Sequence, residues 1–195
     1  MTTENDSREK LIALLQLAYS GELAVAYAYR GHWHSVSNDY ERNSIRSIED
    51  DEWRHRKLVG GMLAGLGTGS NKRREIRAAI IGRTLGLLCH VTGWLAPMYG
   101  AGRLESRNVK EYETAALYAR ECGRADLIDC LLEMAEVEWD HELYFRSRVL
   151  SHALGRRLPL WPQPPPKETM RLSHDRVARS TQENSPQASG VVFLN

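Results

Sequence analysis

Two stretches of the 195-residue chain decide its fold: IRSIEDDEWRHRKLVGGMLAGL at residues 45–66 and LIDCLLEMAEVEWDHELYFRSRV at residues 127–149. In each stretch, apolar residues recur three and four positions apart, which is the period of a helix that buries one face. Each apolar stripe is interrupted by a glutamate and a histidine three residues apart. The pairs are Glu52 and His55 in the first stretch and Glu138 and His141 in the second. Both stretches therefore predict helices that direct a carboxylate and an imidazole into the core.

Capping signals and glycines predict where the long helices begin and end. Asp6 with Glu9, and Asn38 with Glu41, resemble helix starts, and glycines at the ends of the periodic stretches resemble helix stops. We expect four long helices at about residues 6–34, 38–66, 102–122 and 125–150. No strand pattern or internal repeat competes with this interpretation. The predicted fold class is all-α, a four-helix bundle with one long helical crossover between the second and third helices.

The crossover occupies about residues 70–97 and is basic at its start, then apolar with spaced glycines. Pro97 and Gly100 are expected to end it. The apolar part, residues 84–102, is flanked by Arg83 and Arg103, a composition that suits a helix resting at the surface of a membrane. Packing against the bundle, or against a partner subunit, is the alternative.

The chain changes composition after the fourth helix. Residues 158–166 read LPLWPQPPP and cannot be helical. We therefore divide the chain into a bundle at residues 1–155 and a Pro-rich segment with a tail at residues 156–195, of which residues 167–195 are expected to be flexible.

Composition excludes several classes of protein. The 26 basic and 25 acidic residues leave a net charge of +1, so the chain lacks the positive charge that a nucleic-acid partner would attract. Its three cysteines have no CxxC spacing, which gives no sign of a disulfide framework or a zinc knuckle. The polar N-terminus lacks the apolar core of a signal peptide, so we expect the protein in the cytoplasm.

The first and third helices are each expected to add one glutamate to the two Glu-x-x-His pairs. Glu22 is the lone carboxylate on the apolar stripe of the first helix. On the third helix Glu113 lies about 7 Å off the level of Glu138, counted from the turn at Gly123 at 1.5 Å per residue. Glu105 and Glu111 are both about 4.5 Å off by the same count. Only the more apolar face around Glu105 favours it over Glu111.

Four carboxylates directed into one core need counter-charge, because an unpaired ion in an apolar interior is costly. No Arg or Lys occupies the four stripes at this level. Two divalent irons would neutralise four carboxylates, and two neutral imidazoles would complete the ligand set. We expect Glu22, Glu52 and His55 to hold one iron and Glu105, Glu138 and His141 the other, with Glu52 and Glu138 bridging. Manganese in one position is left open.

Neighbouring residues are given less specific roles. His32 and His34 lie near the end of the first helix, where a cationic side chain interacts favourably with the helix dipole. Tyr29 and Tyr112 share stripes with the expected ligands, and core packing is preferred for them over hydrogen bonds to the site. Asp51 is a plausible hydrogen-bond partner for a ligating histidine.

The order Glu22, Glu52-x-x-His55, Glu105, Glu138-x-x-His141 resembles the ferritin-like di-iron carboxylate proteins, and in finer detail the demethoxyubiquinone hydroxylase family. The resemblance covers most of residues 10–150. Ser20-Gly21-Glu22-Leu23-Ala24 followed by Tyr29-Arg30-Gly31 is similar to that family's first-helix motif, and the approach to Glu105 and Tyr112 is similar to its third helix. This alignment also selects Glu105 over Glu111. Tyr19-Ser20 departs from the family's His-Ala, Glu111 stands where a His is common, and Glu142 follows His141 in place of a second His.

The resemblance implies an O2-dependent di-iron hydroxylase, with Glu22, Glu52, His55, Glu105, Glu138 and His141 as its catalytic metal ligands. Its implied substrate is a small, hydrophobic, quinone-like aromatic, and its implied partner is an electron donor. Peripheral contact with the inner face of a membrane through residues 84–102 and a homodimer are compatible with it. An iron-oxidising or storage protein and a metal-free helical interaction module are the alternative functions.

Overall fold

The computed structural model describes residues 3–172, and this part of the chain is helical without strands. Its elements are α1 (Thr3–Ser35), α2 (Asp39–Gly65), α3 (Lys72–Leu88), α4 (Leu95–Glu121), α5 (Ala125–Ser151) and the short 3-10 helix η1 (Gly155–Arg157). The expected all-α class is confirmed for these residues.

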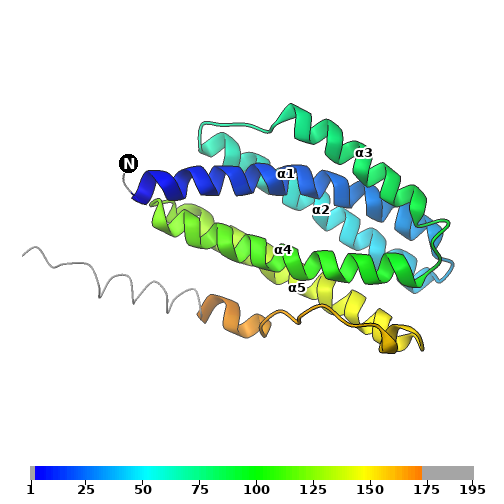
Figure 1. The fold of residues 1–195 in the computed structure, drawn as a ribbon. Helices are drawn as coiled ribbons and strands as arrows, with labels where there is room; N and C mark the ends of the chain where they lie inside the picture. Colours follow the sequence, from blue (N-terminus) through cyan, green and yellow to red (C-terminus); the bar gives the residue numbers. More distant parts are fainter. Residues whose placement is uncertain (1–2, 173–195) are drawn as a thin grey trace, which may run out of the picture.

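The four longest helices, α1, α2, α4 and α5, lie along one another (Figure 1). Extensive contacts join α1 with α2, α4 with α5, and α1 with α4. Helices α2 and α5 also interact through side chains, such as His55 and Glu138, which are buried and lie 3.0 Å apart. The long helix α3 lies outside this group, along α1, and connects α2 with α4.

Local signals explain where the helices begin and end. Asn38 caps α2 by accepting a hydrogen bond from the Glu41 backbone N–H over 3.0 Å, as its sequence predicts. A cap of this kind contributes about 1 kcal/mol. Gly123 takes a φ of 72° between α4 and α5, a conformation that favours glycine. The sequence-predicted bounds of α2 and α5 therefore agree with the structure to within about two residues.

The start of α4 corrects the expected boundary. This helix begins at Leu95, so Pro97 and Gly100 lie inside it and do not end the crossover. Proline is tolerated here because backbone N–H groups in a first turn have no helical acceptor. Gly102, the expected helix start, is instead a packing site: a Cβ atom there would lie 2.3 Å from the ring of Trp161.

Residues 159–172 pack on the helices, which corrects the expectation of a flexible segment from residue 167. The Trp161 side chain is buried and donates a hydrogen bond to Glu142 over 2.6 Å. Residues 167–172 are helical, and Met170 is fully buried against the core. This segment runs back along α5 (Figure 1). The remaining part of the expected tail, residues 173–195, lies outside the described residues.

The apolar core is divided into two clusters. One lies towards the N-terminal end of α1 and includes Leu11, Leu15, Val59, Val109 and Leu131. The other lies towards the far end of α1 and includes Val25, Ile45, Met98, Phe145 and Trp161. On each of the four long helices at least one buried polar residue lies between the two clusters. The division therefore marks the level of the site.

By length and composition alone, α1 is apolar enough to cross a membrane. One such helix is weak evidence, because buried core helices satisfy the same criterion. Here α1 packs against α2, α3 and α4.

Candidate metal centre

Six buried side chains from the four long helices meet at the level where the apolar core is divided. They are Glu22 from α1, Glu52 and His55 from α2, Glu105 from α4, and Glu138 and His141 from α5, each at most 5% exposed. Residues three apart on one helix share a face, which is why each Glu-x-x-His pair turns both members inward. The structure thus brings together all six residues singled out in the sequence.

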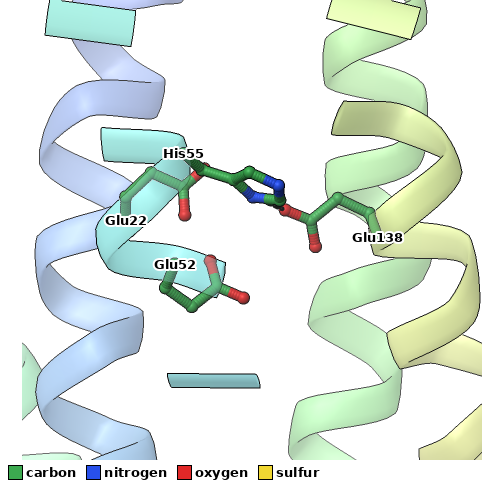
Figure 2. Close-up of side chains that lie close together, drawn as sticks. All are labelled: Glu22, Glu52, His55 and Glu138. Carbon is green, nitrogen blue, oxygen red and sulfur yellow. Dashed lines mark hydrogen bonds and ion pairs between the residues drawn. The ribbon is translucent and has the colours of Figure 1, made fainter. Parts of the chain in front are cut away.

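The six residues form two overlapping groups, each with ligand atoms within 4.8 Å of one another. The first group is Glu22, Glu52, His55 and Glu138 (Figure 2). The second group is Glu52, Glu105, Glu138 and His141. Glu52 and Glu138 belong to both. Each of the two buried groups could hold a metal ion.

The candidates on α4 are separated by burial. Glu105 is fully buried and belongs to the second group. Glu111 instead forms an ion pair with Arg107 over 2.6 Å on the outer face of the helix. The apolar face around Glu105, which separated the two on sequence grounds, is the face that α4 turns inward. Glu113 is not a member of either group.

Hydrogen bonds cross between the helices at the site. His55 Nδ1 lies 3.0 Å from Glu138 Oε1. The hydroxyl of Tyr112 on α4 donates to Glu22 on α1, and the hydroxyl of Tyr29 on α1 donates to Glu105 on α4. The two tyrosines therefore hold the two glutamates that are not shared, a role beyond the core packing preferred from sequence.

The second group has two further polar neighbours. Asp51 Oδ2 lies 3.3 Å from His141 Nε2, the partner that the sequence suggested. Asn108 Nδ2 donates to Glu105 Oε2 over 3.1 Å and lies 3.5 Å from Glu138 Oε2. Asn108 was missed by sequence reasoning. Its position one turn after Glu105, on the same helix face, is the signal that could have found it.

Burial and mutual repulsion distort the acid–base properties of the carboxylates. Burial raises the pKa of Glu22 well above its usual value, and the neighbouring Glu52 and Glu138 raise it further. Burial and the charge of Glu138 likewise raise the pKa of Glu105. For Glu138 burial acts in the same direction, but the neighbouring Glu105 and His141 and the hydrogen bond with His55 outweigh it and hold the pKa well below its usual value.

The pKa values of the two imidazoles are raised, although burial alone would lower them and favour the neutral forms. Burial lowers the pKa of His141, but the hydrogen bond with Asp51 and the nearby carboxylates of Glu138 and Glu52 outweigh it and raise the pKa well above the usual value. The pKa of His55 is also raised, because the hydrogen bond and charge of Glu138 outweigh burial. Without a metal ion, the site therefore retains protons that an ion would displace.

Three other buried glutamates show how this chain normally neutralises a carboxylate in its core. Each accepts hydrogen bonds from an arginine and from at least one tryptophan ring N–H. The pairings are Glu41 with Arg148 and Trp94, Glu49 with Arg30, Trp33 and Trp53, and Glu142 with Arg146 and Trp161. None of the four central glutamates pairs with an arginine or a lysine of the described residues.

Several polar atoms of the central site are buried without a hydrogen-bond partner in the described part of the chain. They are Glu22 Oε2, both carboxylate oxygens of Glu52, and His141 Nδ1. Leaving such atoms unpaired costs roughly 1–3 kcal/mol each. All four belong to residues of the two groups above. This donor set of oxygen and imidazole nitrogen atoms fits divalent first-row metal ions such as iron.

A pocket of about 240 Å³ reaches the site from the side covered by α3. Glu22, Asn108, Tyr112 and Arg107 are among its lining residues, and apolar side chains such as Val25, Ile81 and Leu104 line most of the rest. The cluster is therefore accessible to a small apolar molecule from between α1, α3 and α4.

The environment of His32 differs from the expected role as a cation at the end of the first helix. His32 is 2% exposed, stacks with the rings of Tyr29 and Phe145, and cannot act as a cation at the end of α1. Burial lowers its pKa to about 4, so the imidazole is neutral at pH 7. His34, by contrast, is exposed in the last turn.

Comparison of the chain with protein-family models, with curated proteins and with solved structures finds no match.

Proposed function

We propose that this protein is an O2-dependent hydroxylase with two iron ions, built on a ferritin-like four-helix bundle in which α3 is the crossover. The observation that carries the proposal is the central cluster of four carboxylates and two imidazoles, buried without arginine or lysine partners among the described residues. Metal ions are the counter-charge that suits such a set of ligands.

Each residue of the site has a role in this proposal. Glu22 and His55 would hold one iron, Glu105 and His141 the other, and Glu52 and Glu138 would bridge them. The hydroxyls of Tyr112 and Tyr29 orient the two unshared glutamates. Asp51 and Asn108 orient ligands on the side of the second ion. Such outer partners commonly change metal affinity by about 10–100-fold.

Two bound irons would supply the redox chemistry by which substrate, O2, two electrons and two protons give hydroxylated product and water. The protein's own contribution would be the mostly apolar pocket at Glu22, which would position a hydrophobic substrate beside the cluster. We propose a small, quinone-like aromatic as the substrate and a separate reductase or other electron donor as the partner.

Two observations support this function over the two alternatives: the apolar lining of the pocket and the unpartnered ligand atoms. An iron-storage protein needs an acidic path for the incoming ion, whereas the pocket that reaches Glu22 is lined mostly by apolar residues. A metal-free interaction module would have no use for the unpartnered ligand atoms of Glu52 and His141.

We further propose that the protein works in the cytoplasm against the inner face of a membrane. Leu87 and Val91, at the end of α3 and just after it, are 72% and 77% exposed. Arg83 and Arg103 flank this apolar surface in the sequence. A homodimer that buries the same residues is the competing explanation. Sedimentation with anionic vesicles, reduced by Leu87→Ser, would support the membrane, and a concentration-dependent mass change lost in the same variant would support the dimer.

The test of the hydroxylase is oxygen incorporation. The iron-loaded chain, a chemical reductant and substituted phenols or hydroquinones are incubated under ¹⁸O2, and products are analysed by mass spectrometry. Incorporation of one ¹⁸O atom, abolished in Glu52→Gln and retained in Glu111→Gln, is expected. Consumption of O2 with iron oxidation, but without labelled organic product, would contradict the hydroxylase and favour iron oxidation as the function.

A further inference from the structure

A second pocket, of about 430 Å³, lies beside the pocket at Glu22. Its walls come from α1, from α3 with the turn that follows it, and from α4. The two pockets share four apolar lining residues: Val25, Ala28, Leu85 and Leu104. A volume of this size lies within the range of pockets that bind small molecules.

The polar hydrogens in this pocket are already used, with one exception. Cys89 and Thr92 donate to the backbone carbonyls of Leu85 and Leu88. The hydroxyl of Tyr29 donates to Glu105. His32 Nε2 is buried and has no hydrogen-bond partner in the described part of the chain. Among the lining residues, His32 is therefore the one that carries a buried polar atom without a partner in the described part of the chain.

The His32 ring is held in place by its surroundings. It stacks on Phe145 with the ring centroids 6.1 Å apart and the planes 15° apart, and on Tyr29 with values of 6.4 Å and 26°. The neighbouring Gly31 lets α3 approach closely, since a Cβ atom there would lie 2.2 Å from the Gly86 Cα atom. The imidazole and the α3 wall of the pocket are thus fixed before any ligand binds, which favours specific recognition.

A buried neutral imidazole without a partner is costly unless something supplies one. A neutral imidazole nitrogen either donates or accepts one hydrogen bond, depending on the tautomer. An oxygen substituent on an otherwise apolar molecule satisfies it in both cases. Aromatic rings suit the remaining lining, because the face of Tyr29 and the aliphatic side chains around it offer contact area without further hydrogen bonds.

We propose that this second pocket binds an aromatic ring that carries a hydroxyl or carbonyl oxygen, with His32 Nε2 as its hydrogen-bond partner. His32 is then the residue that selects oxygenated rings over plain hydrocarbons. The identification of this ligand with the substrate rests on the proposed function, because the shared residues place it next to the pocket that reaches Glu22. Binding itself requires no metal ion.

The test compares 4-ethylphenol with ethylbenzene, two probes that differ by one hydroxyl group. Their dissociation constants are measured by calorimetry on the metal-free and the iron-loaded chain. The ratio of the two constants is compared between the unaltered chain and His32→Phe, because this comparison cancels the different hydration of the probes. We expect His32→Phe to shift the ratio about fivefold against the phenol. His34→Phe, an exposed control on the same helix, should leave it unchanged.

Two further measurements cover a variant that fails to fold. His32→Gln keeps a hydrogen-bonding group and should keep part of the preference. In the unaltered chain, saturating 4-ethylphenol should slow alkylation of Cys89, which lines the pocket, and not of Cys130, as read by peptide mass spectrometry. The inference is overturned if neither probe binds, if Cys89 is not protected, or if the ratio in His32→Phe equals that of the unaltered chain.

These outcomes are independent of the metal. A chain that binds no iron but shows the His32-dependent preference keeps this inference and removes the hydroxylase. A chain that binds two irons but shows no effect of His32 keeps the proposed metal site and removes this inference.

Discussion

Buried histidines occur in two regions of this molecule, and their surroundings differ in kind. His55 and His141 lie beside carboxylates at the centre of the four long helices, and those carboxylates raise the pKa of both. His32 lies among aromatic rings beside the second pocket, and burial alone lowers its pKa to about 4. The first region suits a charged ligand and the second an uncharged one. In the proposed function the first region holds the metal ions and the second binds the neighbouring apolar molecule.

The largest expected effect comes from the shared carboxylates of the central region. Glu138 belongs to both groups, so Glu138→Gln should lose both iron ions. Glu22 belongs only to the first group, so Glu22→Gln should keep one. Glu111→Gln, which alters an outward-facing glutamate, should keep both. Iron per folded chain, measured by mass spectrometry of the metal, checks the series, and equal losses in Glu22→Gln and Glu138→Gln would refute the division into two groups.

The next largest effect is expected on the pH dependence of the free energy of unfolding, through His32. The lowered pKa of His32 means that the unfolded chain takes up a proton first as the pH falls. The stability that depends on neutral His32 is therefore present above about pH 6.5 and is lost as the pH falls towards 4, by about 3 kcal/mol. Denaturant titrations of the metal-free chain should show this loss in the unaltered protein and in His34→Phe, but not in His32→Phe. Parallel stability curves for all three would contradict a buried neutral imidazole.

Asp51 tests whether the two ions have unequal support. Asp51 precedes Glu52 on α2 and lies beside His141. The corresponding residue before Glu138 on α5 is Val137, which offers no such carboxylate to His55. Asp51→Asn should weaken the ion of the second group by about 10–100-fold and leave the other unchanged. Competition with a chelator measures both affinities, and Asp50→Asn is the exposed control. Equal weakening of both ions would show that Asp51 acts on the whole site.

The smallest expected effect is that of the tyrosine hydroxyls. Tyr112→Phe and Tyr29→Phe each remove one hydrogen bond to an unshared glutamate. The free energy of unfolding of the iron-loaded chain should fall by about 1 kcal/mol in each variant. The half-buried Tyr118, which packs against the core away from the site, supplies the control Tyr118→Phe. A loss no greater than in that control would mean that the hydroxyls do not support the glutamates.

Much of the central region could be predicted from the sequence. Helical periodicity predicts which face is buried, so the phase of Glu52, His55, Glu138 and His141 was available from their apolar neighbours. The same argument favoured Glu105 over Glu111. Level along the axis could not decide between them, because the offset between neighbouring helices depends on side-chain packing.

The surroundings of His32 were harder to predict from the sequence. The histidine at position 32 lies near a helix end, where cationic side chains are common, and only the tertiary contact with Phe145 shows that it is buried. Close approaches between distant segments are hidden from the sequence in the same way. Gly102 indicated a helix start, but its role is to admit the ring of Trp161, which comes from a segment more than fifty residues later. Contacts so distant in sequence leave no local periodicity.

The central claim is tested most directly by counting metal in the unaltered chain. The protein is purified without added metal, reconstituted anaerobically with Fe²⁺, freed of loosely bound ions, and analysed for iron and zinc per chain. We expect two tightly bound irons for each chain. A chain that binds no ion, or that holds a single zinc and excludes iron, would contradict this expectation.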